Sequence, residues 1–468
     1  MRAWKLCGLA LVLFGCSGSG GAAAGPSSDI DSSVSEVASD TATSGDSTSG
    51  DSTATDAMRD ARVEGGSEIG TKCPTPPIAD PHVDDRTACK FNKGAKVGAT
   101  LGFTDSMRAA LPIKHLIVVM NENRSFDHYF GKLSSEGQPD AEGFPGSWSN
   151  KDRAGVAVSP YHAPTTCIKP DVPHGWAPMH DKWNGGAMDG FVIASDSPTN
   201  DGHYAMQYYT KADLPFYNFL GKTWAISDRY FASVIGPTWP NRDFFYAATS
   251  DGVKNTGERA ITVPTIFDSM NTAKVKWGIF GDGRARTDCV SLADADAHFK
   301  NMAAFYTALD DGTLPEVSIL SPTGPQDEHP PEDVQNGEAY SRRIYEAVRK
   351  SPLWPKLALI YTYDEGGGFF EHVPPPKTCL PSPSETEFNR MGFRVPLMVV
   401  SPYARPHFVS HEPHEHTSIT RLIELLHDLP ALTARDANSD ALLDLFDFDC
   451  PSMLDAPPAP PSGKGGCP

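Results

Sequence analysis

Short apolar runs that do not alternate with polar residues constrain the fold of this chain most. A strand with one face in water alternates apolar and polar side chains, whereas a strand covered on both faces reads as a nearly continuous apolar run. Runs of this second kind occur at Leu116–Met120, Val275–Phe280, Val317–Leu320, Leu357–Tyr363 and Leu397–Val400. They predict the strands of a sheet that is buried on both faces.

Helical periodicity separates the later runs. Residues 338–350 and 417–427 place apolar side chains three or four positions apart, which puts them on one face of a helix. Thr417 is the expected N-cap of the second helix. Alternating strands and helices predict a three-layer α/β/α sandwich with a largely parallel central sheet, formed by one domain over residues 109–450.

The composition changes on both sides of this domain. Residues 17–70 are almost all Ser, Gly, Ala, Thr and Asp. Such a segment cannot bury enough apolar surface to offset the entropy lost on ordering, so we expect a disordered tether. Residues 71–108 form an irregular Cys- and Pro-rich lead-in, and residues 451–468 form a Pro/Gly-rich tail. The net charge of -19 argues against a nucleic-acid partner.

The first sixteen residues have the features of a secretory signal. Arg2 and Lys5 supply a positive region, and Leu9–Phe14 is an apolar core too short to span a bilayer. The segment ends in Cys16 and resembles the lipobox of bacterial lipoproteins, which implies diacylation of Cys16. We therefore expect an exported lipoprotein anchored in a membrane, at the periplasmic face, in the outer membrane or at the cell surface. The alternative is an ordinary cleaved signal with a chance cysteine.

Export makes disulfides the default state of the remaining cysteines. Because their number is odd, at least one thiol is expected to stay outside a disulfide. Cys73–Cys89 and Cys450–Cys467 are the expected pairs, because each closes a short loop near one end. The seven cysteines beyond the signal are Cys73, Cys89, Cys167, Cys289, Cys379, Cys450 and Cys467.

Polar side chains follow two of the predicted strands directly. Glu122 and Asn123 come after the first run, and Asp364 and Glu365 come after the fourth, before three glycines. In such folds, chemistry collects beyond the carboxyl ends of strands. Adjacent carboxylates repel one another unless a cation neutralises them, and oxygen ligands suit hard divalent cations. We predict a metal site here, and the alternative is a solvated acidic turn.

A third stretch, GPTWPNR at residues 236–242, places Thr238 in a turn braced by glycine and proline. A hydroxyl held near a cation becomes a nucleophile when the cation stabilises its alkoxide. Asn241 would donate a hydrogen bond to an anionic oxygen. Taken alone, a threonine between two prolines is usually a turn residue.

Further stretches accompany these clusters. They are NGGAMDGF (184–191), YYTKADLPFY (208–217), SDRYFASVIGPTWPNR (227–242), DEHPPEDV (327–334), YDEGGGFFEHVPPP (363–376) and HTSITRLIE (416–424). With residues 122–128, they resemble the bacterial phosphoesterase family of phosphatidylcholine-type phospholipases C and their acid-phosphatase relatives. That family is similar to the alkaline-phosphatase-like superfamily. The seven stretches occur in the family's order and cover roughly residues 112–450.

The resemblance implies roles for individual residues. It implies a divalent metal, with Ca²⁺ and Zn²⁺ both left open, and Thr238 as both nucleophile and metal ligand. Asn241 would contact the phosphoryl group, while His174 and His329 would donate to phosphate or protonate the leaving group. His372 and His416 would either support the site or simply pack. The other implied metal ligands are Glu122, Asn123, Asp364 and Glu365.

The expected function is metal-assisted hydrolysis of a phosphoester outside the cytoplasm. The resemblance favours a phospholipase C that cuts a phospholipid into diacylglycerol and a phosphorylated headgroup through a phosphothreonine. The alternatives are a phosphomonoesterase of the acid-phosphatase type and a non-catalytic binding lipoprotein. One departure from the family is Gly366, which stands where close relatives often have a histidine after the Asp-Glu pair.

Overall fold

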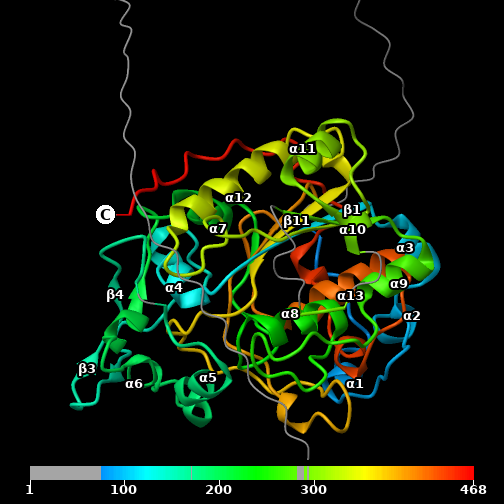
Figure 1. Ribbon diagram of the computed structural model, residues 1–468. Coiled ribbons are helices and arrows are strands. Elements are labelled where there is room, and N and C mark those ends of the chain that lie inside the picture. The colour runs from blue at the N-terminus through cyan, green and yellow to red at the C-terminus, as the bar shows by residue number, and fades with distance from the viewer. Residues whose placement is uncertain (1–74, 170, 282–288, 292–294, 468) are drawn as a thin grey trace, which may run out of the picture. The chain divides into compact units, whose positions relative to one another are not determined.

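A computed structural model describes residues 75–467, apart from residues 170, 282–288 and 292–294 (Figure 1). The predicted signal peptide with Cys16, the tether at 17–70 and Cys73 lie outside the described residues. In the described part of the chain, no helix combines the length and the apolar character needed to cross a bilayer.

A central sheet organises the described residues. Along it, β1 pairs in parallel with both β10 and β11, and the pairs β10–β8, β8–β9 and β13–β6 are also parallel. Only β12 runs antiparallel to its neighbours, β11 and β6. In sheet order, the eight strands found in the described residues are β13 (Phe408–Ser410), β6 (Ala225–Ser227), β12 (Leu397–Val400), β11 (Leu357–Tyr363), β1 (His115–Asn121), β10 (Val317–Leu320), β8 (Trp277–Phe280) and β9 (Phe299–Lys300).

The apolar runs of the sequence form the interior strands, as predicted. β10, β11 and β12 have the expected bounds, β1 is one residue longer at each end, and β8 begins two residues later, at Trp277. These strands are buried along almost their whole length. The sequence did not predict β6, β9 and β13, which are only two or three residues long.

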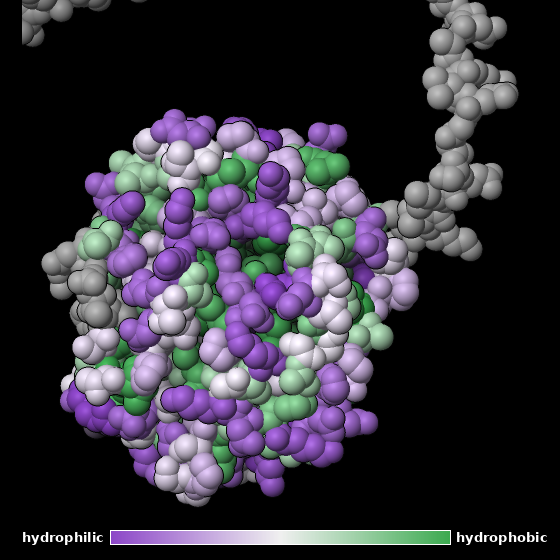
Figure 2. Space-filling view, turned by 90° about the vertical axis from the view of Figure 1, so that its right-hand side faces the viewer, coloured by the Kyte–Doolittle hydropathy of each residue, from purple (hydrophilic) through white to green (hydrophobic). Residues whose placement is uncertain are grey.

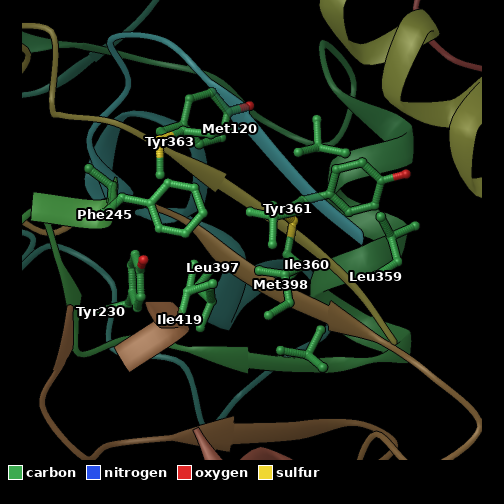
Figure 3. Packing of buried hydrophobic residues seen from close by; sticks show 14 of the residues in the cluster. Met120, Tyr230, Phe245, Leu359, Ile360, Tyr361, Tyr363, Leu397, Met398 and Ile419 are labelled. Carbon is green, nitrogen blue, oxygen red and sulfur yellow. The ribbon is translucent and has the colours of Figure 1, made fainter. Parts of the chain in front are cut away.

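Helices cover both faces of the sheet. α7 (Pro215–Thr223) and α12 (Val334–Val348) lie on one face, where the Tyr361 hydroxyl of β11 donates to Ser341 O of α12 at 2.7 Å. α8, α9 and α13 lie on the other face (Figure 1). Figure 3 shows Phe245 of α8 and Ile419 of α13 among the buried side chains beside β11 and β12. The predicted three-layer α/β/α sandwich is therefore confirmed.

The helices on the second face begin at well-defined residues. α13 starts at His416 rather than after Thr417, and its N-cap is Glu415. Glu415 and Ser418 form a reciprocal capping box, in which Glu415 N donates to Ser418 Oγ at 3.2 Å. The predicted N-cap is wrong because the Thr417 hydroxyl instead shares a 2.6 Å hydrogen bond with Ser439 Oγ. The bounds of this layer are α8 (Thr238–Ala247), α9 (Ile266–Ala273) and α13 (His416–His427).

Smaller elements complete the described structure. The remaining α-helices are α1 (Val83–Thr87), α2 (Val97–Thr100), α3 (Asp105–Ala110), α4 (Phe126–Phe130), α5 (Trp176–Trp183), α6 (Phe191–Ser195), α10 (Ala295–His298), α11 (Met302–Asp310) and α14 (Ala434–Ala437). Three two-stranded sheets pair β2 (Asn150–Lys151) with β3 (Ala157–Val158), β4 (Tyr161–His162) with β5 (Gln207–Tyr208), and β7 (Tyr230–Phe231) with β14 (His414–Glu415). On the face in Figure 2, hydrophilic residues separate most of the hydrophobic ones.

Two disulfides between described residues tie the lead-in and the tail to the domain, and they correct the expected pairing. Cys89 bonds to Cys379 and Cys167 bonds to Cys467. Both expected pairs are therefore wrong, because the partners lie 290 and 300 residues apart and meet only through folding. Cys289 is a buried thiol outside any disulfide, in agreement with the odd count.

Candidate active site

The two strand-end clusters lie together, because β1 and β11 are adjacent, parallel and in register to their last residues. Asn123 N donates to Asp364 Oδ1 at 3.2 Å, and Arg124 N donates to Glu365 O at 3.0 Å. Glu122, Asn123, Asp364 and Glu365 are all fully buried. The alternative of a solvated acidic turn is therefore excluded, and four oxygen-bearing side chains meet at this edge of the sheet.

Glycine makes this close approach possible. Gly367 has a φ of +62°, and a Cβ atom on it would lie 2.1 Å from the carbonyl oxygen of Asn123. Only glycine fits such a contact without moving the backbone. Gly367 N also donates to Glu365 Oε2 at 2.7 Å, which fixes one oxygen of that carboxylate.

A buried arginine neutralises part of the carboxylate charge. Arg242 Nε donates to Asp364 Oδ2 at 3.1 Å, and an Arg242 terminal nitrogen donates to Glu122 Oε1 at 3.2 Å. The three side chains are at most 1 % exposed. Arg242 follows Thr238 by one helical turn on α8, so the predicted nucleophile lies on the same side of that helix as the carboxylates. The sequence predicted that a metal ion neutralises these carboxylates, and the guanidinium of Arg242 supplies part of that positive charge.

Two oxygens of the cluster remain suited to a metal ion. Asn123 Oδ1 and Glu365 Oε1 are buried and accept no hydrogen bond from the described residues. Burial, followed by the charge of Asp364, raises the pKa of Glu365 well above its ordinary value. A buried oxygen without a donor is costly unless a cation binds it. These oxygens therefore fit the oxygen ligands of a hard divalent cation.

Elsewhere in the described residues, three clusters bring ligand atoms of three His, Cys, Asp or Glu residues within 4.8 Å of one another. The cluster of Cys167, Asp333 and Cys467 contains the two cysteines of a disulfide. In the cluster of Asp127, Glu371 and His372, Arg394 donates to both carboxylates. The cluster of Asp171, His174 and His329 borders the candidate site.

The two predicted histidines lie at this site. His174 Nδ1 donates to Val172 O at 2.7 Å, and its Nε2 accepts from Asn123 Nδ2 at 3.3 Å. Burial lowers the pKa of His174, which favours this neutral form. His329 Nδ1 donates to Pro330 O at 2.6 Å, and the two rings lie 5.6 Å apart. The structure thus places His174 against the oxygen cluster and His329 next to His174.

Thr238 is the first residue of α8 and is nearly buried. Asn241 holds the turn before it: the amide nitrogen donates to Gly236 O at 2.9 Å and to Pro237 O at 3.0 Å, and Oδ1 accepts from Val234 N at 2.9 Å. The structure therefore gives Asn241 a part in positioning Thr238. Its contact with a phosphoryl group stays a prediction.

The two other histidines differ in their relation to the site. His416 Nε2 donates to Asp364 O at 2.7 Å, and its Nδ1 accepts from the Tyr230 hydroxyl at 2.9 Å. Burial lowers the pKa of His416 to about 4, so the ring is neutral and supports Asp364. His372 instead donates from Nδ1 to Asp127 Oδ2 at 2.7 Å within a buried ion network.

Two buried ionisable residues near the site were not predicted from the sequence. Lys182 of α5 donates from Nζ to Pro173 O, next to His174, and burial lowers the pKa of Lys182 to about 7. Glu328 accepts from the Tyr129 and Tyr363 hydroxyls at 2.5 and 2.7 Å, and burial raises its pKa to about 7. Glu328 lies in the DEHPPEDV stretch, whereas no pattern in the sequence marks Lys182.

Comparison with known proteins shows which family this chain belongs to. The model of the Phosphoesterase family matches residues 113–430. Non-specific phospholipase C6 of Arabidopsis thaliana is 31% identical over 73% of this chain and 75% of its own length. Phospholipase C B of Mycobacterium tuberculosis is 32% identical over 72% of this chain and 78% of its own.

Solved structures resemble the chain more weakly than these relatives do. A protein in the alkaline phosphatase superfamily from Vibrio parahaemolyticus is similar over 77% of both chains, with a TM-score of 0.38 and 9% identity. The assignment therefore depends on the sequence relatives. The chain belongs to the Phosphoesterase family and is a hydrolase that acts on phosphoester bonds.

Proposed function

We propose that this protein is an exported phospholipase C that hydrolyses a phospholipid to diacylglycerol and a phosphorylated headgroup. Two relatives that align over most of this chain are named phospholipases C. The observation that carries the proposal is the pair of unpartnered oxygens, Asn123 Oδ1 and Glu365 Oε1, beside the helix that begins with Thr238.

The proposed reaction has two displacements at phosphorus. Thr238 Oγ1 attacks in line, a bond from Oγ1 to phosphorus forms, and the bond to the diacylglycerol oxygen breaks. Water then attacks the phosphothreonine and releases the phosphorylated headgroup, which restores the hydroxyl. A divalent cation held by Glu122, Asn123, Asp364 and Glu365 would stabilise the threonine alkoxide and the charge on phosphate oxygens.

The remaining steps fall to other side chains. Asn241 keeps the turn in place, so Thr238 is oriented before substrate arrives. His329 uses Nδ1 for a backbone carbonyl, so its Nε2 is the nitrogen that would carry a proton to the leaving oxygen. His174 Nε2 lies 3.9 Å from Glu365 Oε1 and would contact a bound phosphate when protonated.

Nitrophenyl esters test this proposal against its alternatives. We expect release of nitrophenol from nitrophenyl phosphorylcholine to exceed release from nitrophenyl phosphate and sulfate, to stop with a chelator and to return with added metal. Faster hydrolysis of nitrophenyl phosphate would identify a phosphomonoesterase. No release from any ester, with metal present, would favour a binding lipoprotein and overturn the proposal.

Export and anchoring rest on the first sixteen residues of the sequence. If Cys16 carries the lipid, Cys16→Ser should move the protein from the detergent phase to the aqueous phase without changing activity per molecule. Cys7→Ser is the matched control and should leave partitioning unchanged. Unchanged partitioning of Cys16→Ser would show that the anchor lies elsewhere.

A further inference from the structure

Asp171 lies at the edge of the candidate site and has no role in the reaction described above. The Tyr204 hydroxyl donates to Asp171 O at 3.3 Å, which fixes its backbone. The side chain is 41% exposed, and its Oδ1 atom is buried without a hydrogen-bond partner in the described residues. The carboxylate therefore faces both the solvent and the site.

No neighbouring histidine directs a proton at this carboxylate. His174 Nδ1 is 3.6 Å from Asp171 Oδ1, but its proton goes to Val172 O. His329 Nε2 is 4.0 Å from Asp171 Oδ2, while the Nδ1 atom of that ring donates to Pro330 O. Two histidine rings therefore flank the carboxylate, and their Nδ1 atoms donate to backbone carbonyls instead of to Asp171.

The hydrogen bonds of the two histidines also indicate which kind of cation could bind beside Asp171. A metal bound by Asp171 and His174 Nδ1 would need a lone pair on a nitrogen that already donates to a carbonyl. An ammonium group needs no directed lone pair, because charge and aromatic faces are enough to bind it. The surroundings of Asp171 therefore suit an organic cation better than a metal ion.

The distance from the oxygen cluster fits such a group on the substrate. The His174 ring lies between two carboxylates, 3.9 Å from Glu365 Oε1 and 3.6 Å from Asp171 Oδ1. A phosphoryl group held near Glu365 would therefore be separated from Asp171 by the width of the His174 imidazole ring. In phosphocholine and phosphoethanolamine, two carbons separate the phosphate oxygen from the nitrogen, which is a comparable span.

We propose that Asp171 binds the positively charged nitrogen of the headgroup and makes this enzyme selective for cationic over uncharged phosphoryl substituents. The proposal deepens the phospholipase C function and rests on it for the natural substrate. It adds a specificity residue that touches the part of the substrate that does not react.

Competition between two small phosphates tests the proposal without a phospholipid. Phosphocholine and glycerol 3-phosphate share the phosphoryl group but differ in the charge of the substituent. In the wild type, phosphocholine should inhibit nitrophenyl phosphate hydrolysis more strongly than glycerol 3-phosphate. In Asp171→Asn, inhibition by phosphocholine should weaken about tenfold, while inhibition by glycerol 3-phosphate stays the same.

Two further variants serve as controls. Asp171→Glu keeps the charge and should retain most of the preference, and Asp181→Asn, on the exposed side of α5, should change neither inhibitor. Equal weakening of both inhibitors in Asp171→Asn, or no preference in the wild type, would overturn the proposal. If the wild type shows the preference but cleaves no phospholipid in mixed micelles, the phospholipase function fails while the role of Asp171 stands.

Discussion

Arg242 Nε donates to Asp364 Oδ2 over 3.1 Å, and this buried contact joins α8 to the carboxyl end of β11. The helix that begins with Thr238 and the strand end that carries the acidic pair are thereby held in one arrangement. A charge-assisted hydrogen bond of this kind is both strong and directional. The protein itself therefore positions the predicted nucleophile, Thr238, relative to the oxygen cluster.

Replacing Arg242 tests this connection. Arg242→Met leaves two buried carboxylates without their partner, so the free energy of unfolding should fall by about 3 to 5 kcal/mol. Arg242→Lys keeps the charge but cannot bridge both carboxylates, and should lose less stability. Urea unfolding measures both. Arg153→Met, which breaks a pair at an exposed arginine, is the control and should have little effect.

Replacing Thr238 tests the proposed nucleophile. Thr238→Ala removes the oxygen that would bond to phosphorus, so turnover should fall by a factor on the order of 10³ or more. Thr238→Ser keeps that oxygen and should retain much of the activity. Thr256→Ala removes a hydroxyl that accepts from Trp239 N beside the same turn, and should cost far less. Near-normal turnover by a folded Thr238→Ala would make a metal-bound water the better candidate.

Replacing Glu365 tests the metal site. Glu365→Gln removes the charge from the carboxylate with the unpartnered oxygen, so the purified variant should contain less divalent metal per chain as well as lose activity. Elemental analysis of the purified protein is the measurement. Glu338→Gln changes another buried acid, which accepts from Phe216 N on α7, and should keep its metal. Full metal content in Glu365→Gln would place the ion elsewhere.

We expect His414 to make a contribution to the free energy of unfolding that depends on pH. Burial alone would lower the pKa of His414, but the carboxylates of Asp440 and Asp444 outweigh it and raise that pKa well above the ordinary value. The folded state therefore holds a proton that the unfolded state loses above about pH 6.5. The stabilisation is complete below that pH and is lost as the pH rises through the folded-state pKa.

Thermal unfolding of His414→Gln measures this contribution. The loss in Tm relative to the wild type should be largest near pH 6 and smaller near pH 9. His427, the last residue of α13, has a pKa that burial lowers, so His427→Gln should not show this trend. A loss in Tm for His414→Gln that stays constant or grows with pH would contradict the ion-pair assignment.

The sequence predicted the parts of this structure that depend on local pattern. The bounds of β11 follow from its apolar run, and the cluster of Asp364 and Glu365 follows from the position of that run's end. Interior strands are long enough for such a pattern to show. β6 and β9 have only three and two residues, which is too few for any period to be recognised.

Features that depend on contacts far apart in the sequence were not predictable in the same way. The pairing of Arg242 with Glu122 joins residues 120 positions apart, and nothing near either residue marks the other. The disulfide between Cys89 and Cys379 could not be predicted for the same reason, because the spacing of cysteines in the sequence does not show which segments pack together. Lys182 is buried by its tertiary surroundings, in a helix whose sequence gives no sign of it.

The disulfides Cys89–Cys379 and Cys167–Cys467 overlap along the chain, since Cys167 lies inside the loop closed by the first and Cys467 lies beyond it. Any single cut of the backbone between residues 89 and 467 falls within at least one of these loops. A protease that nicks a surface loop once would therefore leave the two fragments covalently joined. Such a nicked protein would run as one band on a denaturing gel without reductant and separate only after reduction, so a single cleavage would not by itself release part of the domain.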